Sequence, residues 1–274
     1  MSSDKNSNLF GFLNVYKPKG MTSFDVVAVL RRITKIKQIG HTGTLDPFAV
    51  GVLSICIGKS TRLIEYLKDD KEYLATVQFG QDTDTYDLEG EVTKSYDKKI
   101  TKEELIKVLK FFDGEIEQFP PIYSAIKVNG KKLYELKDFD EKLQQAKILV
   151  ACSKGTYIRS IAYDLGQKMN CGGHLVELVR TKAGLFYQEE STKLDDIKTK
   201  EDVENLLVNP LDVLDFPKRI LTDVEKEKVS HGMSISNNTG INSNIVILVY
   251  GGKIYAVGIA DRDKISTKKV FEVL

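Results

Sequence analysis

The sequence of 274 residues is poor in the residue types that mark disulfide-stapled or metal-bound proteins. It has no tryptophan and only three cysteines, Cys56, Cys152 and Cys171, which share no C-x-x-C spacing. Such cysteines argue against a disulfide framework or a zinc site, so we expect them to be buried, reduced thiols. The three histidines lie far apart without a metal-ligand spacing. We therefore do not expect a metal site.

Long apolar runs are also missing. No stretch approaches the roughly 20 apolar residues that a membrane span needs. The N-terminal residues Met1–Lys5 lack the basic-then-apolar layout of a signal peptide. With 42% hydrophobic and 29% charged residues, the composition is that of a globular protein. We expect a cytoplasmic protein with no membrane partner.

The net charge is only +1, but the charges are strongly segmented. Residues 1–62 carry 9 basic and 3 acidic side chains, and residues 123–187 carry 11 and 6. Residues 63–122 carry 8 basic and 15 acidic side chains, and residues 188–274 carry 12 and 15. If the fold brings the two basic blocks together, they form a positive face for a polyanion. Otherwise they are solvated helix faces.

Hydrophobic periodicity predicts mixed helices and strands without a repeating β-α-β rhythm. Thr22 and Asp25 form a capping box for a helix that continues to Ile33, and a second box begins at Thr101. Alternating apolar residues predict a strand that begins at Tyr73 and another over residues 148–152.

Arg159 stands out in the helix predicted to follow the second of these strands. Ile158, Ile161, Ala162 and Leu165 give that helix its inner face, which places Arg159 in the first turn. The helix dipole disfavours a cation at this end. The position therefore invites a functional explanation.

The C-terminal region after Pro217 reads as short strands. Residues 246–250 and 254–259 flank the turn Gly251-Gly252 and predict a hairpin. A tail of this length can form a small β-barrel, which either binds nucleic acid or serves as a structural cap.

The octapeptide Gly40–Pro47 (GHTGTLDP) holds one carboxylate, Asp46, five residues after His41. Such a carboxylate is either a turn cap, because Asp and Gly favour turns, or a nucleophile. Two nearby motifs fail. Gly58–Ser60 lacks the earlier glycine of a P-loop, and residues 82–87 lack the Gly and Glu of a calcium loop.

The octapeptide and Gly51–Leu53 together resemble the catalytic segment of the TruB-type family, the tRNA pseudouridine-55 synthases. The resemblance covers roughly residues 10–215 and rests on further motifs in the same order: Lys17–Ser23, Lys71–Tyr73, Thr83–Thr85, Pro120–Lys127, Asn129–Tyr134, Cys152–Arg159 and Leu178–Thr181. It implies an α+β pseudouridine synthase fold, a mixed, largely antiparallel sheet flanked by helices. The catalytic domain would span residues 1–215, and a small β-rich, PUA-like RNA-binding domain would span residues 216–274.

The resemblance implies that the enzyme isomerises the uridine at position 55 in the T-arm loop of tRNA. Asp46 would be the nucleophile, since a carboxyl with a pKa of about 3.9 is ionised at neutral pH. Burial could neutralise it, so Arg159, which matches the family's active-site arginine, would keep it ionised and aimed. Tyr73 would stack on the uracil and is a candidate proton acceptor. Attack at ribose C1′, attack at uracil C6 and a glycal route all stay open.

RNA binding would require the target base to be flipped out of its loop. By the same resemblance, His41 would fill the vacated stack, where base stacking contributes about 1–3 kcal/mol. Lysines would contact phosphates without reading sequence. The residues expected to bind RNA are His41, Lys17, Lys19, Lys127, Lys131, Lys132, Lys154, Tyr157 and Arg180.

The implied enzyme needs no metal, cofactor or obligatory protein partner and acts on tRNA as a monomer. One alternative is a guide-RNA-dependent subunit that shares the Asp loop, although Asn129–Tyr134 and the small tail favour the stand-alone form. Another is a non-catalytic RNA-binding or tRNA-folding module. A retaining glycosidase needs a second carboxyl about 5–5.5 Å away. The first 62 residues supply only Asp4, Asp25 and Asp46.

Overall fold

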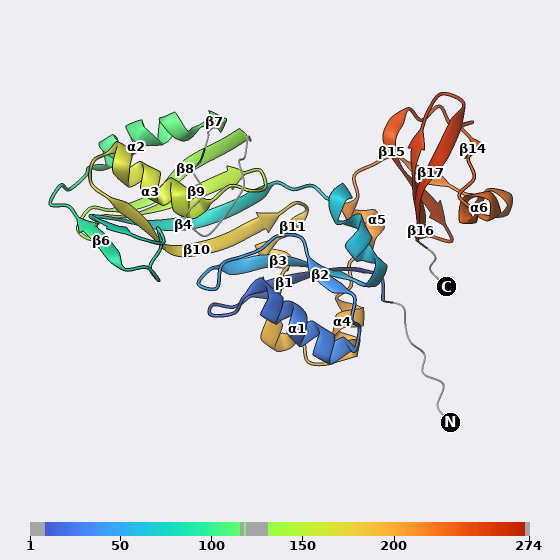
Figure 1. Ribbon diagram of the computed structural model, residues 1–274, viewed down its shortest axis with the longest axis horizontal. Helices are drawn as coiled ribbons and strands as arrows, with labels where there is room; N and C mark the ends of the chain where they lie inside the picture. The colour runs from blue at the N-terminus through green and yellow to red at the C-terminus, as the bar shows by residue number, and fades with distance from the viewer. Residues whose placement is uncertain (1–8, 116–117, 119–130, 272–274) are drawn as a thin grey trace.

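A computed structural model describes residues 9–115, 118 and 131–271 of the chain. Ten described strands form one large sheet: β1 (Gly11–Lys17), β2 (Ile39–His41), β3 (Val50–Ile57), β4 (Lys71–Phe79), β7 (Gly114–Glu115), β8 (Lys131–Asp140), β9 (Gln145–Cys152), β10 (Gly173–Ala183), β11 (Phe186–Tyr187) and β12 (Thr192–Lys193). A separate hairpin joins β5 (Gln81–Thr83) to β6 (Val92–Ser95). Figure 1 shows the helices arranged around the large sheet.

The helical segments of this part are α1 (Ser23–Thr34), η1 (Gly58–Tyr66), α2 (Lys102–Leu109), η2 (Lys110–Phe112), α3 (Ile158–Lys168), η3 (Gln188–Glu190), η4 (Leu194–Asp196), α4 (Lys200–Asn205) and α5 (Pro210–Val213). Both predicted capping boxes are confirmed. The Thr22 hydroxyl accepts from the Asp25 N–H, and the Asp25 carboxylate accepts from the Thr22 N–H. Thr101 and Glu104 form the same pair of bonds at α2.

The large sheet is mixed and largely antiparallel, as predicted. Its strand order is β12-β1-β3-β10-β4-β9-β8-β7, with β2 paired to β3 and β11 paired to β10. Only the β1–β12 and β3–β10 pairs are parallel among these described strands. β4 begins at Lys71 rather than at the predicted Tyr73, because its pairing with both β9 and β10 continues to that residue.

Alternate residues of β3 face two different apolar cores. Leu53, Ile55 and Ile57 pack with residues of α1 and α4, while Val52 and Cys56 pack with the C-terminal part of the chain. This alternation follows from the two-residue period of a strand. A third core lies between α2, α3 and the strands β4 and β9 (Figure 1).

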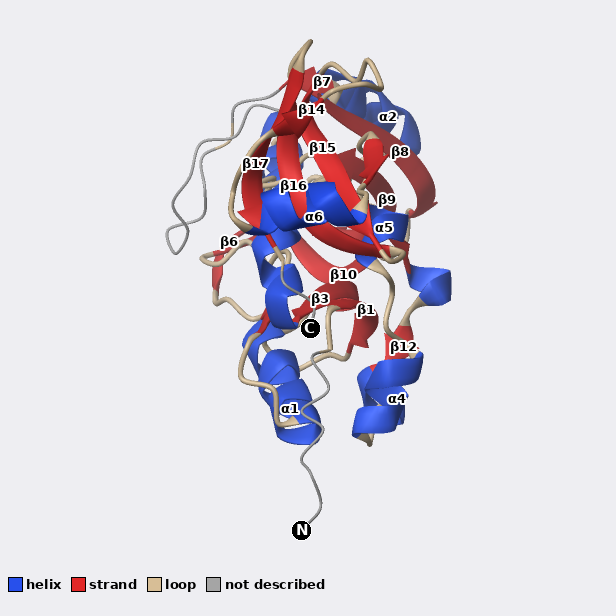
Figure 2. Cartoon of the chain, turned by 90° about the vertical axis from the view of Figure 1, so that its right-hand side faces the viewer, coloured by secondary structure: helices blue, strands red, loops and turns tan. Residues whose placement is uncertain are grey.

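A second sheet of five described strands follows in the C-terminal region, which faces the viewer in Figure 2. It comprises β13 (Lys218–Ile220), β14 (Ile235–Ser236), β15 (Ser243–Tyr250), β16 (Lys253–Ala260) and β17 (Lys264–Val270), beside α6 (Asp223–Ser230), in the order β13-β15-β16-β17-β14. The predicted hairpin is β15–β16. One apolar cluster joins Phe12 and Cys56 to Val257 and Phe271. Because that core is shared, the domain boundary at residue 215 stays a prediction.

The three cysteines are buried and free, as expected. Among the helices of the described residues, none is long and apolar enough to cross a membrane.

Candidate active site

Asp46 lies on the loop between β2 and β3, and α1 helps to hold that loop. The Ser23 hydroxyl accepts from the Leu45 N–H at 2.8 Å and donates to the Leu45 carbonyl at 3.2 Å. The Ala49 N–H donates to the Asp46 carbonyl at 3.1 Å, which closes a turn. The turn interpretation and the nucleophile interpretation of Asp46 are therefore compatible. The backbone of Asp46 forms the turn, and its carboxylate remains available to react.

The Asp46 carboxylate is bound by an arginine that also binds a second acid. Arg159 Nε lies 3.2 Å from Asp46 Oδ2, and Arg159 Nη1 lies 3.1 Å from Asp87 Oδ2. We call these three residues the carboxylate network. Asp87 exposes 4% of its side chain, Arg159 18% and Asp46 35%. Asp46 is therefore the end of the network that a substrate can reach.

Arg159 owes its place to α3, whose first turn carries it. Ile158, Ile161 and Leu165 bury the inner face of this helix, as predicted. Tyr157, at the N-cap, is fixed by Gln118, whose side-chain amide accepts from the Tyr157 N–H at 3.2 Å and donates to its carbonyl at 3.1 Å. The two carboxylates offset the unfavourable helix dipole at this end.

Asp87 was not among the residues predicted from the sequence. Residues 82–87 resemble an incomplete calcium loop, and the family resemblance includes Thr83–Thr85 but stops short of Asp87. In the structure, Asp87 Oδ1 accepts from Thr85 Oγ1 at 2.6 Å and from the Glu89 N–H at 3.0 Å. The unfavourable position of Arg159 was the signal that an acid had to lie nearby. Asp46 is the only acid of its octapeptide, but in the structure it shares Arg159 with a second acid, Asp87.

Burial raises the pKa of Asp46 above its ordinary value. Arg159 opposes this rise, Asp87 adds to it, and Lys17 lowers the pKa slightly. Arg159 is thus the main group that keeps the carboxylate ionised.

Tyr73 lies in β4 opposite Arg180 of β10 and exposes only 7% of its surface. Burial is the largest cause that raises the pKa of its phenol, while Arg180 lowers it. A phenol with a raised pKa stays protonated at neutral pH. The phenol of Tyr73 is therefore a poor proton acceptor, and burial leaves little of its ring exposed.

Lys17 and Arg180 correct an expectation from the sequence. Both side chains are buried, with exposed fractions of 0% and 1%. The Lys17 ammonium donates to the carbonyls of Pro18, Met21 and Pro47. Neither residue exposes surface that a phosphate could contact, so this burial does not favour the RNA-binding role expected for them.

Arg180 braces the same loop from β10. Its Nε donates to the Val52 carbonyl at 2.6 Å, and its Nη atoms donate to the carbonyls of Thr44 and Gly43 at 3.2 and 3.1 Å. β3 approaches this residue closely at Gly51, where φ is +105° and an added Cβ would meet the Arg180 carbonyl. Only glycine suits that position.

His41 lies in β2, opposite Ile55 of β3, with its ring half-buried. Its Nδ1 is buried, and no described residue accepts from it or donates to it. Burial lowers the pKa of His41, and Arg180 lowers it further. The ring is therefore neutral at pH 7.

The remaining residues expected to bind RNA lie outside the carboxylate network. Lys19 is exposed on the turn after β1, and Lys154 is exposed after β9 with its Nζ 3.3 Å from Asp69 Oδ2. Tyr157 is half-buried at the start of α3. Lys131 and Lys132 open β8, but their side chains are not described, and Lys127 lies outside the described residues.

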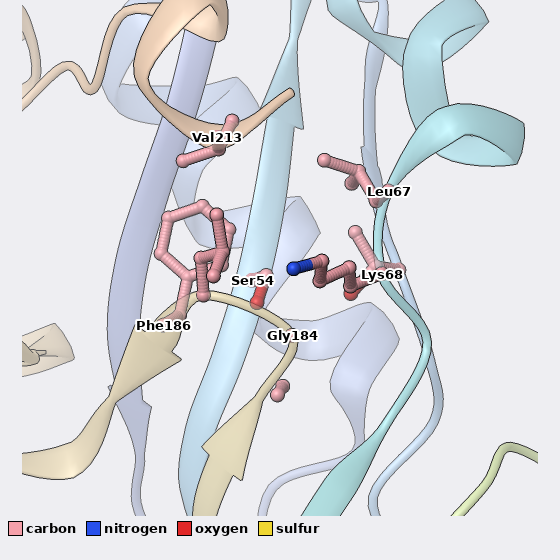
Figure 3. A pocket seen from close by; sticks show the side chains of 9 residues that line it. Ser54, Leu67, Lys68, Gly184, Phe186 and Val213 are labelled. Atoms are coloured by element: carbon pink, nitrogen blue, oxygen red, sulfur yellow. The ribbon is translucent and has the colours of Figure 1, made fainter. Parts of the chain in front are cut away.

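A separate pocket adjoins Thr42 of the same loop (Figure 3). The Lys68 side chain reaches into the pocket toward Ser54, between the apolar side chains of Leu67, Phe186 and Val213, and its ammonium forms an ion pair with Asp215 at 2.8 Å. Neither Asp46 nor Arg159 lines this pocket. The carboxylate network therefore lies elsewhere.

The chain is similar in sequence to curated proteins over most of its length. The tRNA pseudouridine synthase B of Clostridium perfringens is 39% identical to this chain over 281 residues, which cover 93% of the chain and 95% of the relative. The tRNA pseudouridine synthase B of Caldanaerobacter subterraneus is 40% identical and covers 95% of the chain and 99% of the relative.

Solved structures give the same fold. An H/ACA RNP bound to a substrate RNA containing 2′-deoxyuridine contains a chain with a TM-score of 0.74 and 26% identity, over 96% of this chain and 86% of that one. A chain of a Cbf5-Nop10-Gar1 complex has a TM-score of 0.74 and 27% identity, over 96% and 84%. The predicted pseudouridine synthase fold is confirmed.

Two family models match the chain itself. Residues 31–144 match the N-terminal domain of the TruB family pseudouridylate synthases. Residues 159–214 match the C-terminal domain of tRNA pseudouridylate synthase B. The loop of Asp46 falls in the first match, and Arg159 begins the second. This chain belongs to the TruB family of pseudouridylate synthases, isomerases that act on RNA.

Proposed function

We propose that this enzyme converts the uridine at position 55 in the T-arm loop of tRNA into pseudouridine, with the Asp46 carboxylate as nucleophile. The observation that carries the proposal is the carboxylate network, in which Arg159 holds the exposed carboxylate of Asp46 while Asp87 holds Arg159 from the buried side. The shared name of the relatives, tRNA pseudouridine synthase B, supports tRNA as the substrate.

The uridine must leave its loop before Asp46 can act on it, and flipping a base costs a few kcal/mol. The neutral, half-buried ring of His41 is suited to occupy the vacated stack. Tyr73 would stack on the extruded uracil, which requires that more than the 7% of its surface exposed here become accessible when RNA binds. Together, two stacking contacts can offset the cost of extrusion, because each contributes about 1–3 kcal/mol.

The reaction itself is balanced without a co-reactant. The bond from N1 to ribose C1′ breaks, a bond from C5 to C1′ forms, and the proton lost from C5 is replaced by one gained at N1. An ionised carboxylate is the reactive group this exchange requires, whether it attacks C1′, attacks C6 or assists a glycal route. Arg159 serves the carboxylate in each case by keeping it charged and oriented.

We propose that the protein acts as a monomer, without a guide RNA or an obligatory protein partner. Identities of 39–40% to the named tRNA synthases, against 26–27% to the chains of H/ACA assemblies, support this form over the guide-dependent alternative. The division into a catalytic domain (1–215) and a small PUA-like RNA-binding domain (216–274) belongs to the same proposal. Mapping pseudouridine in tRNA treated with the purified protein alone tests it. Modification only after addition of a guide RNA would contradict it.

Asp46→Asn tests the nucleophile. Tritium release from tRNA labelled at uridine C5 should fall to background, while tRNA binding persists, because the amide keeps the shape of the side chain but not its charge. Asp195→Asn, an exposed residue of η4, is the matched control. Turnover near that of the wild type would end the nucleophile assignment. An inactive Asp46→Asn protein that still remodels folded tRNA would reveal an additional RNA-folding role.

A further inference from the structure

Two tyrosines connect the segments that carry Asp87 and Arg159. The rings of Tyr86 and Tyr163 are stacked, with centroids 4.1 Å apart and planes 17° apart. Tyr86 directly precedes Asp87, and Tyr163 follows Arg159 by four residues in α3. Residues four apart share one face of a helix. The stack therefore joins the same turn and the same helix face as the Asp87–Arg159 ion pair.

The backbone of Tyr86 indicates that this arrangement is imposed by its surroundings. Its φ is +64°, in the left-handed region that side chains rarely adopt. Its N–H donates to the Thr83 carbonyl at 3.3 Å, and its carbonyl accepts from the Leu175 N–H at 3.0 Å. The turn is thus bound to β10 through its backbone and to α3 through the Tyr86 ring. A conformation of this kind persists where several contacts determine it.

Beside its two ion pairs, Arg159 donates one long hydrogen bond from Nη1 to the Thr85 carbonyl at 3.4 Å, in the same turn as Asp87. It makes one ion-pair contact with each carboxylate, through Nε to Asp46 and through Nη1 to Asp87. Whether it reaches both depends on the distance between α3 and the turn that carries Asp87. A face-to-face ring contact beside the ion pair limits that distance.

We infer that the Tyr86–Tyr163 stack is a positioning device that sets the separation of α3 from the Asp87 turn, so that Arg159 binds Asp46 and Asp87 at once. The inference rests on the proposed role of Asp46 as nucleophile. Neither tyrosine is assigned a contact with the reacting atoms. Because the rings make the contact, their hydroxyl groups are dispensable.

Tyr163→Leu, which keeps apolar volume but removes the ring, tests the inference in the full-length protein. The single-turnover rate of pseudouridine formation on saturating tRNA should fall about tenfold, since small misplacements of a catalytic group are costly. The affinity for tRNA should stay unchanged. Tyr163→Phe should restore the rate.

The pH profile separates positioning from a general structural defect. Arg159 lowers the pKa of Asp46, whereas Asp87 raises it and Lys17 lowers it. If Arg159 moves away in Tyr163→Leu, the acid limb of the single-turnover profile should move to higher pH. Phe111→Leu is the control, because the Phe111 ring contacts Lys168 at the other end of α3. That variant should leave both the rate and the acid limb unchanged.

Tyr86→Gly provides a second test in case Tyr163→Leu does not fold. Glycine adopts positive φ without strain, so this variant removes the ring and retains the turn. It should show the same loss of rate and the same shift of the acid limb. A wild-type rate in either folded variant, or weaker tRNA binding with an unchanged rate, would overturn the inference. Asp46→Asn, assayed in parallel, tests the nucleophile separately, because this variant leaves both tyrosines in place.

Discussion

Cations surround the Asp46 loop in two regions that differ in what the cations bind. In the carbonyl-braced region, Lys17 and Arg180 are buried and donate to backbone carbonyls of the loop and its neighbours. In the carboxylate network, Arg159 is partly exposed and lies between Asp46 and Asp87. The same kind of charge thus supports a backbone in one region and tunes an acid in the other.

The difference teaches that the partner of a buried cation sets its role. A carbonyl is neutral, so Lys17 keeps its full charge near Asp46 but is penalised by burial, which lowers its pKa to about 8. A carboxylate compensates the guanidinium directly, so Arg159 can stay in the site and still respond to a substrate. Substitutions in the carboxylate network should therefore lower mainly the single-turnover rate. Substitutions in the carbonyl-braced region should lower mainly the free energy of unfolding.

The largest effect is expected at Arg159. Arg159→Ala should lower the single-turnover rate about 10³-fold, comparable to the loss of one preorganised charge partner in other active sites. The acid limb of the profile should move to higher pH, because the group that lowers the pKa of Asp46 is gone. The midpoint of thermal unfolding should also fall, because the buried Asp87 carboxylate loses its charged partner, so the rates are compared per folded molecule.

Two further variants sharpen this expectation. Arg32→Ala, on the exposed face of α1, should behave as the wild type. Arg159→Lys should recover only part of the rate, since an ammonium lacks the planar fork that reaches two carboxylates. Unchanged turnover together with lost tRNA binding would instead place Arg159 among the phosphate contacts.

Asp87→Asn should have the next largest effect, on the same region. The rate at the plateau should fall about 10²-fold, because Arg159 loses the charged partner that aims it. The acid limb should move to lower pH, opposite to Arg159→Ala, since Asp87 raises the pKa of Asp46. Single-turnover rates measured from about pH 4 to about pH 8 would show both the lower plateau and the shifted acid limb, because this range covers the ordinary titration of carboxyl and histidine side chains.

Asp84→Asn is the matched control for this variant. Asp84 is exposed in the same turn, where its Oδ1 accepts from the Glu91 N–H at 2.9 Å. The two variants therefore share chemistry and location but not the contact with Arg159. Equal losses in both would mean that the turn, rather than the charge of Asp87, supports the rate.

Local signals in the sequence predicted several helices and strands, whereas the fold class and the site residues came from the family resemblance. The Thr22–Asp25 and Thr101–Glu104 capping boxes fixed two helix starts, because capping depends on residues three apart. Strand alternation located β4, β9 and the β15–β16 hairpin within two or three residues. Asp46 and Arg159 followed from the family resemblance, supported by the unfavourable place of Arg159 in its helix.

Contacts between distant residues could not be predicted in this way. Asp87 meets Arg159 across 72 positions, and Arg180 meets the Val52 carbonyl across 128. The expectation that Lys17 and Arg180 contact RNA came from the family resemblance, and basic side chains usually stay exposed, so nothing in the sequence pointed to their burial. Their burial depends on how β1, β3 and β10 align, which the local pattern does not specify.

The smallest effect on catalysis is expected in the carbonyl-braced region. Lys17→Met should lower the free energy of unfolding by about 2–3 kcal/mol, because carbonyls of Pro18, Met21 and Pro47 lose a buried donor. The rate per folded molecule should fall much less than in Arg159→Ala. Urea unfolding and single-turnover assays on the same samples would measure the two quantities.

The pH dependence of this destabilisation identifies its origin. Burial lowers the pKa of Lys17 from 10.5 to about 8 in the folded protein. Between these values the unfolded chain binds more protons at Lys17, so the wild type gains stability as pH rises, and Lys17→Met lacks this gain. The stability gap between the two proteins should therefore widen from pH 7 to pH 9.5. A gap that narrows over this range would mean that Lys17 is stabilised as a cation, and the contrast between the two regions would fail.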